Sequence, residues 1–270
     1  MTTSLSETQQ KDYWREGYLA PLPALEPDRA RNYRAALEAA EAQAGEAFDR
    51  GLRHKPHLVW NWADELIRET SVLDAVEGIL GPDILCWESA LFTKDARSSS
   101  YISWHQDITY WGLEAEGNVV TAWIALSPST RLSGCMRVVP GTHTERVIEH
   151  RDTHAADNLL SRGQELAVDV DEADAVDIEL QPGQMSLHHV KIFHGSNPNR
   201  SDDRRIGFAV RYIPPHLRQQ AGTADSARLV RGEDNFGHFE LEQPPAGDFS
   251  AQALAAHKRL RDQRMAIMMR

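Results

Sequence analysis

Residues 181–212, QPGQMSLHHVKIFHGSNPNRSDDRRIGFAVRY, set two short β-rich runs on either side of a polar loop. A Gln-Pro-Gly turn precedes the first run, and the loop Gly-Ser-Asn-Pro-Asn precedes the second. Both runs are rich in the branched and aromatic residues that suit a pleated, half-buried surface. The segment therefore predicts two strands separated by a rigid turn.

More runs of this kind begin near residue 84, with Gly, Pro, Ser and Asn turns at hairpin-like spacing between them. They read ILCWESALF, YISWHQD, NVVTAWIAL, CMRVVP and VDIEL. Strands this short and this numerous favour a barrel or a double-sheet jelly roll over a doubly wound parallel sheet. We therefore expect a mainly β protein with flanking helices, built on a double-stranded β-helix, the cupin-like jelly-roll barrel.

Helical patterns stand on both sides of these strands. Residues 27–49 begin with a proline and continue with alanine, arginine and glutamate, and residues 59–80 repeat apolar positions at helical spacing. The final 20 residues indicate one more helix. We expect a single domain over residues 1–270, divided into a helical buttress at about 1–83, a jelly-roll core at about 84–215 and a C-terminal extension at 216–270.

The insertion at residues 142–176 is polar and too long for a hairpin loop, and such segments tend to be lids or binding loops. Within it, DNLLSRG at 157–163 combines an amide, two leucines and a cation. Asn158 and Arg162 are four residues apart, so a helix would point both at a ligand. The alternative is an ordinary surface helix with a solvated arginine.

Composition narrows the class of partner. A chain of 270 residues with 41% hydrophobic residues buries a proper core, and its formal net charge of −11 argues against nucleic acid and anionic membranes. A small molecule is the expected partner, and the oligomeric state stays open. Cys86 and Cys135 are too few for a disulfide framework. The N-terminal sequence has no apolar leader, so we expect a cytoplasmic protein.

The stretch SWHQDITYW at residues 103–111 sets a histidine and an aspartate one residue apart. In an extended strand the side chains of His105 and Asp107 would point to the same face. Among the twelve histidines of the chain, His194 stands at a strand end beside a rigid turn, where it is well placed to meet this pair. Two histidines and one carboxylate leave one face of a metal open, as in non-haem Fe(II) oxygenases.

An arginine follows in the next predicted strand. Alternation puts two arginines and two small residues on one face: Arg205, Gly207, Ala209 and Arg211. Arg204 faces the other way. Guanidinium binds a carboxylate through two parallel hydrogen bonds, so Arg205 suits the far carboxylate of a dicarboxylic co-substrate such as 2-oxoglutarate, whose 2-oxo acid end chelates iron.

Four motifs carry a family resemblance: WHQD at 104–107, VVTAWIAL at 119–126, GCMRVVPGTH at 134–143 and HGSNPNRSDDRR at 194–205. With them the chain resembles the phytanoyl-CoA dioxygenase family of Fe(II)/2-oxoglutarate oxygenases, which includes ectoine hydroxylases and syringomycin-type halogenases. The resemblance implies His105, Asp107 and His194 as iron ligands and Arg205 as the 2-oxoglutarate anchor, with O₂ as the second co-substrate. It also implies a place near the co-substrate for Gln106, Trp123 and Ser196. Thr121 shares a strand face with Trp123 and joins this set.

The resemblance also bears on the reaction. Halogenating relatives have a small residue in place of the carboxylate, whereas this chain has Asp107. The resemblance therefore implies hydroxylation of an amino-acid-like, acyl or natural-product substrate, with release of succinate and CO₂. Two alternatives stay open: another oxidative outcome at the same iron, such as halogenation, desaturation or cyclisation, or a jelly-roll module that binds a metabolite without catalysis.

The remaining candidates have competing structural explanations. Tyr110 and Trp111 either line a pocket or cover the barrel edge, and Trp123 is either a co-substrate neighbour or core filler. Arg211 shares a face with Arg205 and would add positive charge. We therefore expect a substrate with a carboxylate or another acidic group.

Overall fold

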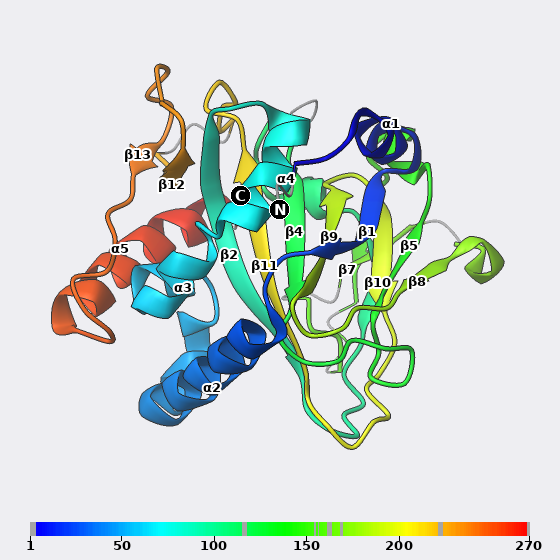
Figure 1. Ribbon diagram of the computed structural model, residues 1–270, viewed down its shortest axis with the longest axis horizontal. Coiled ribbons are helices and arrows are strands. Elements are labelled where there is room, and N and C mark those ends of the chain that lie inside the picture. Colours follow the sequence, from blue (N-terminus) through cyan, green and yellow to red (C-terminus); the bar gives the residue numbers. More distant parts are fainter. Residues whose placement is uncertain are drawn as a thin grey trace.

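The structure is a computed structural model that describes most of the chain. The described residues are 4–114, 118–153, 155, 157–160, 164–167, 170–220 and 224–268, without the side chains of Tyr110, Gln164 and residues 265–268. Two β-sheets face one another, and helices cover the outer side of the larger sheet (Figure 1).

The larger sheet has seven strands, in the order β1 (Tyr18–Pro23), β9 (Gln184–His189), β4 (Val120–Ala125), β11 (Arg205–Ile213), β2 (Ile84–Lys94), β12 (Ser226–Arg231) and β13 (Glu240–Leu241). The smaller sheet has four, in the order β3 (Ile102–His105), β10 (Phe193–Ser196), β5 (Met136–Val139) and β8 (Val176–Ile178). A separate pair joins β6 (His150–Asp152) to β7 (Gln164–Leu166). Sequence-distant strands pair throughout, as in a jelly roll, and the predicted fold is confirmed.

The described residues form five α-helices: α1 (Glu7–Glu16), α2 (Pro27–Ala44), α3 (Asn61–Leu66), α4 (Thr70–Leu80) and α5 (Ala251–Met268). Shorter turns of helix lie at Phe48–Leu52, Pro56–Leu58, Asp107–Tyr110, Thr142–Thr144 and Glu172–Asp174. The main core forms where α2, α3 and α4 pack on the large sheet, with Phe208 and Val210 of β11 inside it. The alternate residues of β11 therefore face the space between the sheets. No helix within the described ranges combines the length and apolar content needed to cross a membrane.

Two expectations for the N-terminal region need correction. It is not wholly helical, because β1 forms an edge of the large sheet beside β9. An edge strand tolerates Pro21 and Pro23, which lack the N–H that an interior strand would need. The expected helix at 59–80 is divided into α3 and α4, which are separated at residues 67–69. The predicted helix at the C-terminus is confirmed as α5.

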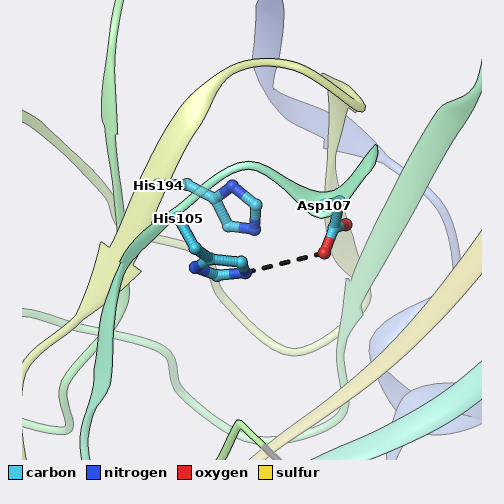
Figure 2. Close-up of side chains that lie close together, drawn as sticks. All are labelled: His105, Asp107 and His194. Carbon is cyan, nitrogen blue, oxygen red and sulfur yellow. Dashed lines mark ion pairs between the residues drawn. The ribbon is translucent and has the colours of Figure 1, made fainter. Parts of the chain in front are cut away.

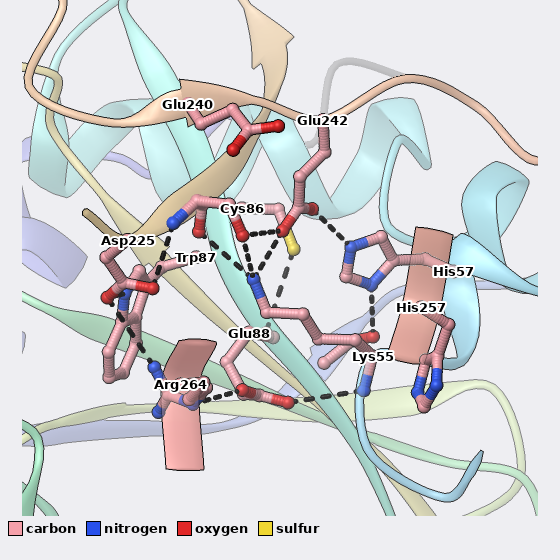
Figure 3. Close-up of polar contacts among 12 residues, drawn as sticks. Lys55, His57, Cys86, Trp87, Glu88, Asp225, Glu240, Glu242, His257 and Arg264 are labelled. Atoms are coloured by element: carbon pink, nitrogen blue, oxygen red, sulfur yellow. Dashed lines mark hydrogen bonds and ion pairs between the residues drawn. The ribbon is translucent and has the colours of Figure 1, made fainter. Parts of the chain in front are cut away.

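A buried polar network fastens the C-terminal extension to the barrel (Figure 3). The carboxylate of Glu242 lies against the ammonium of Lys55 and 2.7 Å from Nε2 of His57. The other ring nitrogen of His57 lies 2.6 Å from the Ser89 hydroxyl on β2. Burial opposes ionisation of Glu242, but Lys55 and His57 outweigh it and lower the pKa of the carboxyl to about 2.

Replacing Glu242 with glutamine should therefore strongly destabilise the fold. It leaves Lys55 buried without its counter-charge, which typically costs about 3–5 kcal/mol of unfolding free energy. The matched control is Glu240→Gln, because Glu240 pairs with Arg259 at the surface, where such pairs contribute at most about 1 kcal/mol. Urea unfolding measures both. Equal losses in the two variants would contradict a structural role for the network.

Candidate active site

Three possible metal ligands meet between the sheets, and their side chains point toward one another (Figure 2). His105 ends β3, Asp107 begins the short helix that follows, and His194 lies opposite His105 on the paired strand β10. One ligand atom from each lies within 4.8 Å of the other two, and all three residues are buried. The predicted same-face arrangement of His105 and Asp107 is thus present, and antiparallel pairing brings His194 to it.

Backbone contacts orient both imidazole rings. Nδ1 of His105 lies 2.9 Å from the carbonyl of Ser103, and Nδ1 of His194 lies 3.0 Å from the carbonyl of Ile192. A carbonyl can only accept, so each Nδ1 carries the hydrogen and each Nε2 keeps its lone pair. This is the tautomer that a metal-binding histidine needs.

Charge around the ligands suits a cation. Burial opposes ionisation of Asp107, but Arg211, with Nε 3.8 Å from its carboxylate, and His105 hold the pKa of Asp107 below its ordinary value. Burial, followed by the effect of His105, lowers the pKa of His194 well below its usual value. Asp107 is therefore anionic and His194 neutral near pH 7, the states in which both bind a metal.

A cavity opens beside the three ligands and extends between the sheets. Its apolar lining includes Phe92, Ile102, Trp123, Met136, Leu160 and Ala209, and its polar lining includes Thr121, His188, Ser196, Arg205 and Arg211. His105 and Asp107, at the end of β3, and His194, on the neighbouring strand β10, lie on one side of this cavity. The rest of the cavity is available to molecules that bind next to the metal site.

Arg205 lies in this cavity and is only 1% exposed. Its Nη1 donates to the carbonyl of Gly134 at 2.9 Å, whereas its Nε and Nη2 have no hydrogen-bond partner in the part of the chain that the structure describes. No described carboxylate forms an ion pair with it. Burial lowers its pKa to about 10, which still leaves it cationic at neutral pH. A buried, half-satisfied guanidinium is a fitting anchor for a carboxylate.

The surroundings of Arg205 explain why β11 has a glycine at position 207 and why the register of β11 decides which arginine enters the cavity. A Cβ on Gly207 would lie 1.9 Å from Cζ2 of Trp123, so a larger residue would displace the indole. The Arg205 guanidinium lies 5.3 Å from the centre of the Trp123 ring system. Arg204 points the other way and donates two 2.8 Å hydrogen bonds to Glu41 of α2. The predicted alternation of the two arginines is observed.

The other predicted co-substrate residues divide into two groups. Thr121, Trp123 and Ser196 all line the cavity, and Oγ1 of Thr121 has no hydrogen-bond partner within the described ranges. Gln106 does not line it: its amide donates to the carbonyl of Lys191 at 2.9 Å and accepts from the N–H of Ile148 at 2.8 Å. Between His105 and Asp107, its side chain ties the insertion to the end of β3.

The predicted substrate residues are also divided. Arg211 lines the cavity, with its guanidinium 4.9 Å from the ring system of Trp111, which supports it from outside the lining. Asn158 donates to the Ser103 hydroxyl at 2.8 Å, and its backbone forms a bridge with Tyr101 rather than a helical turn. The expectation that 157–160 is helical is therefore wrong. Arg162 and the side chain of Tyr110 lie outside the described residues.

The sequence alone assigned neither Lys94 nor His188 to the site. Lys94 is 1% exposed at the end of β2, directly opposite Arg205 in the sheet. The sequence offered one indication of this burial: Lys94 lies on the same strand face as Ala90 and Phe92, where a charged side chain would be shielded from solvent. His188 lines the cavity, and its ring centre lies 5.1 Å from that of His194.

The histidine next to it makes stability depend on pH. Nδ1 of His189 accepts a hydrogen bond from the N–H of Lys191 at 3.1 Å, and burial, followed by the charge of His143, lowers the pKa of His189 to about 3. The unfolded chain therefore binds more protons below about pH 6.5, so stability is full above that pH and falls as pH decreases. From pH 7.5 to pH 5 this residue should account for a loss of about 2 kcal/mol.

The substitution His189→Phe tests this dependence. The free energy of unfolding, measured in urea at both pH values, should fall by about 2 kcal/mol less in the variant than in the parent protein. The control is His216→Gln, since His216 is exposed. An unchanged pH dependence in His189→Phe would show that His189 is not responsible.

A jelly roll with two histidines and a carboxylate at a cavity defines the non-haem Fe(II) oxygenase class. The chain belongs to the phytanoyl-CoA dioxygenase (PhyH) family, whose profile matches residues 5–207. It is 29% identical over 188 residues to a probable alpha-ketoglutarate-dependent hypophosphite dioxygenase of Stutzerimonas stutzeri, covering 68% of this chain and 61% of that protein. It is 29% identical over 147 residues to the peroxisomal phytanoyl-CoA dioxygenase of Bos taurus, covering 52% and 43%. The chain thus spans less than two thirds of these curated relatives.

Solved structures agree with the fold. The apo form of the non-heme monooxygenase ThoJ is 36% identical, with a TM-score of 0.87 and coverage of 97% of both chains. Its nickel complex is 33% identical, with a TM-score of 0.82 and coverage of 97% and 98%. CytC3 with Fe(II) and alpha-ketoglutarate is 21% identical, with a TM-score of 0.69 and coverage of 91% and 96%, a likeness of fold.

Proposed function

We propose that this protein is an Fe(II)/2-oxoglutarate-dependent dioxygenase that hydroxylates a small molecule. One observation carries the proposal: the group of His105, Asp107 and His194 opens onto a cavity that also holds the buried, half-unpartnered guanidinium of Arg205. A metal site alone needs no buried cation nearby. A metal that shares its cavity with a carboxylate anchor suits a co-substrate with a chelating end and a distal carboxylate.

Each residue then has a defined task. Nε2 of His105, Nε2 of His194 and the Asp107 carboxylate would hold Fe(II), while Arg205 would bind the distal carboxylate of 2-oxoglutarate. When bound, the metal supplies the redox chemistry that couples O₂ and 2-oxoglutarate to substrate hydroxylation, with succinate and CO₂ as the other products. The chain itself orients the ligands, excludes water and fixes the co-substrate. The unpartnered hydroxyl of Thr121 is a further donor in the same cavity.

Arg211 favours a substrate with an acidic group. It lines the cavity beside Asp107, it is buried, and no described residue forms a hydrogen bond with its Nε. Its 3.8 Å ion pair with Asp107 would weaken once that carboxylate binds a metal, which leaves more of its charge for a substrate. The Stutzerimonas stutzeri relative is named for hypophosphite, itself a small anion.

The insertion at 142–176 would serve as the lid of this site. Leu160 from this insertion reaches the cavity lining, and Gln106 holds its residues 146–148 against the end of β3. Closure over the substrate would keep water from the reacting groups. We keep the predictions that residues 1–270 form one oxygenase domain and that it acts in the cytoplasm.

Turnover assays test the reaction and the substrate class together. The protein with Fe(II), 2-oxoglutarate and O₂ is offered matched acidic and neutral members of amino-acid, acyl and natural-product panels. Succinate is measured alongside product mass. Hydroxylation adds one oxygen, whereas desaturation or cyclisation removes two hydrogens. We expect the mass of an acidic compound to increase by one oxygen with the parent protein. This product should not form with the Arg211→Gln variant. If no succinate forms with any of the compounds tested, the proposed function is contradicted and a module that binds a metabolite without catalysis is favoured.

A further inference from the structure

Two buried basic side chains stand side by side at the Arg205 end of the cavity. Lys94 and Arg205 are directly opposite one another on β2 and β11, and each is 1% exposed. Neither forms an ion pair with any carboxylate among the described residues. Buried charges are normally paired, so this arrangement is unfavourable until an anion arrives.

The Lys94 amine is surrounded by oxygen atoms. Nζ lies 2.7 Å from Oγ of Ser196, 3.3 Å from the carbonyl of Ser196, and within hydrogen-bond distance of the carbonyl of Asn197. Ser196 also lines the cavity, whereas Lys94 does not. Ser196 is therefore the contact that links Lys94 to the cavity.

The charge of Lys94 depends on what occupies the cavity. Burial, followed by repulsion from Arg205, lowers its pKa to about 6. The titratable groups that act on it are Arg205 on β11 and the Cys135 thiol next to β5, while its contacts on β10 are the hydroxyl and carbonyl of Ser196. Without an anion Lys94 is therefore mostly neutral at pH 7.5.

Hydrogen counting then determines the direction of the contact with Ser196. A neutral amine has two hydrogens and one lone pair, but Nζ has three oxygen neighbours, two of which are carbonyls that can only accept. Both hydrogens go to the carbonyls, so the Ser196 hydroxyl must donate to the lone pair. An ammonium group instead donates to all three oxygens, and the Ser196 hydrogen becomes free.

We propose that Lys94 is a positioning residue for the co-substrate, which takes up a proton as 2-oxoglutarate binds and so frees the Ser196 hydroxyl to donate to the distal carboxylate. This rests on the proposed function, since Arg205 must first receive that carboxylate. The proton comes from solvent, no bond other than N–H is formed, and the bound carboxylate balances one of the two cations.

Proton uptake is directly measurable by titration calorimetry. The Ni(II)-loaded protein is titrated with 2-oxoglutarate at pH 7.5 in two buffers of different ionisation enthalpy, and the difference in heat gives the protons bound per ligand. The parent protein should take up about one proton. Its Kd should rise by up to about tenfold between pH 7 and pH 8, because proton uptake favours binding at lower pH.

Variants and a second ligand isolate the source of the proton. Lys94→Met should bind 2-oxoglutarate more weakly, without proton uptake, and with a Kd that no longer changes over this pH range. Ser196→Ala should bind more weakly but keep the uptake. Pyruvate has the same chelating end without the distal carboxylate, so it should cause no uptake. The control Lys258→Met removes an exposed lysine of α5 and should match the parent protein.

The outcomes separate the two proposals. If the parent protein binds 2-oxoglutarate without proton uptake, Lys94 does not have this role, while the proposed function stands. Uptake that persists in folded Lys94→Met also overturns the role. If the Ni(II)-loaded parent does not bind 2-oxoglutarate at all, the proposed function itself fails. Should Lys94→Met not fold, the comparison of 2-oxoglutarate with pyruvate in the parent still decides.

Discussion

Replacing Arg205 with glutamine is expected to raise the KM for 2-oxoglutarate by about 100-fold, because a buried charge-assisted pair is worth a few kcal/mol. Glutamine removes both the charge and the paired N–H donors. Among the described residues Arg205 lacks partners for Nε and Nη2 and forms no ion pair with a carboxylate, so the substitution breaks none there. The measurement is the initial rate of succinate formation at varied 2-oxoglutarate.

Arg204→Gln is the matched control for this prediction. Arg204 is the adjacent residue, but its guanidinium pairs with Glu41 at the outer side of the barrel. The KM should therefore change little, although the free energy of unfolding falls slightly. Similar KM changes in the two variants would mean that the β11 register does not determine co-substrate binding.

Loss of either histidine ligand is expected to weaken Fe(II) binding by more than about 100-fold, beyond the effect typical of residues that only support a ligand. His105→Ala and His194→Ala each leave two of the three groups, with a gap that solvent fills. Backbone carbonyls fix both rings with Nε2 free for a metal. An anaerobic Fe(II) titration measures the affinity.

His216→Ala provides the comparison, because His216 is an exposed histidine. It should bind Fe(II) as the parent protein does. A His194→Ala variant with the affinity of the parent would exclude this residue as a ligand. His188 lies close enough to His194 that its own variant, His188→Gln, would then be the next to examine.

Local pattern predicted the parts of this protein that alternate regularly. The two-residue period of β11 separated Arg205 from Arg204. Here each side chain's direction follows from backbone geometry, because the pleat leaves no other choice. His105 and Asp107 also meet, although β3 ends at His105 and only the extended Gln106 links it to the short helix that Asp107 begins. His194 was harder, since its meeting with His105 depends on the pairing of β3 with β10.

The features that the sequence did not predict depend on contacts between distant residues or lie in segments without regular secondary structure. β1 contains two prolines and resembles a loop, but it gains its partners from β9 far along the chain. Asn158 lies in a segment without periodicity, where the bridge to Tyr101 replaces the expected helix. Lys94 looks like an ordinary strand end until pairing sets it opposite Arg205. Sequence spacing carries no information on such contacts.

The most direct test of the central claim is an anaerobic spectrum of the protein with Fe(II) and 2-oxoglutarate. A 2-oxo acid chelated to Fe(II) absorbs visible light, so one spectrum reports the metal and the co-substrate together. We predict that the band appears in the parent protein, requires both components, and is lost in His194→Ala. In the Arg205→Gln variant the band should appear only at a much higher concentration of 2-oxoglutarate. Absence of the band from the iron-loaded parent, or its full presence in His194→Ala, would contradict the account.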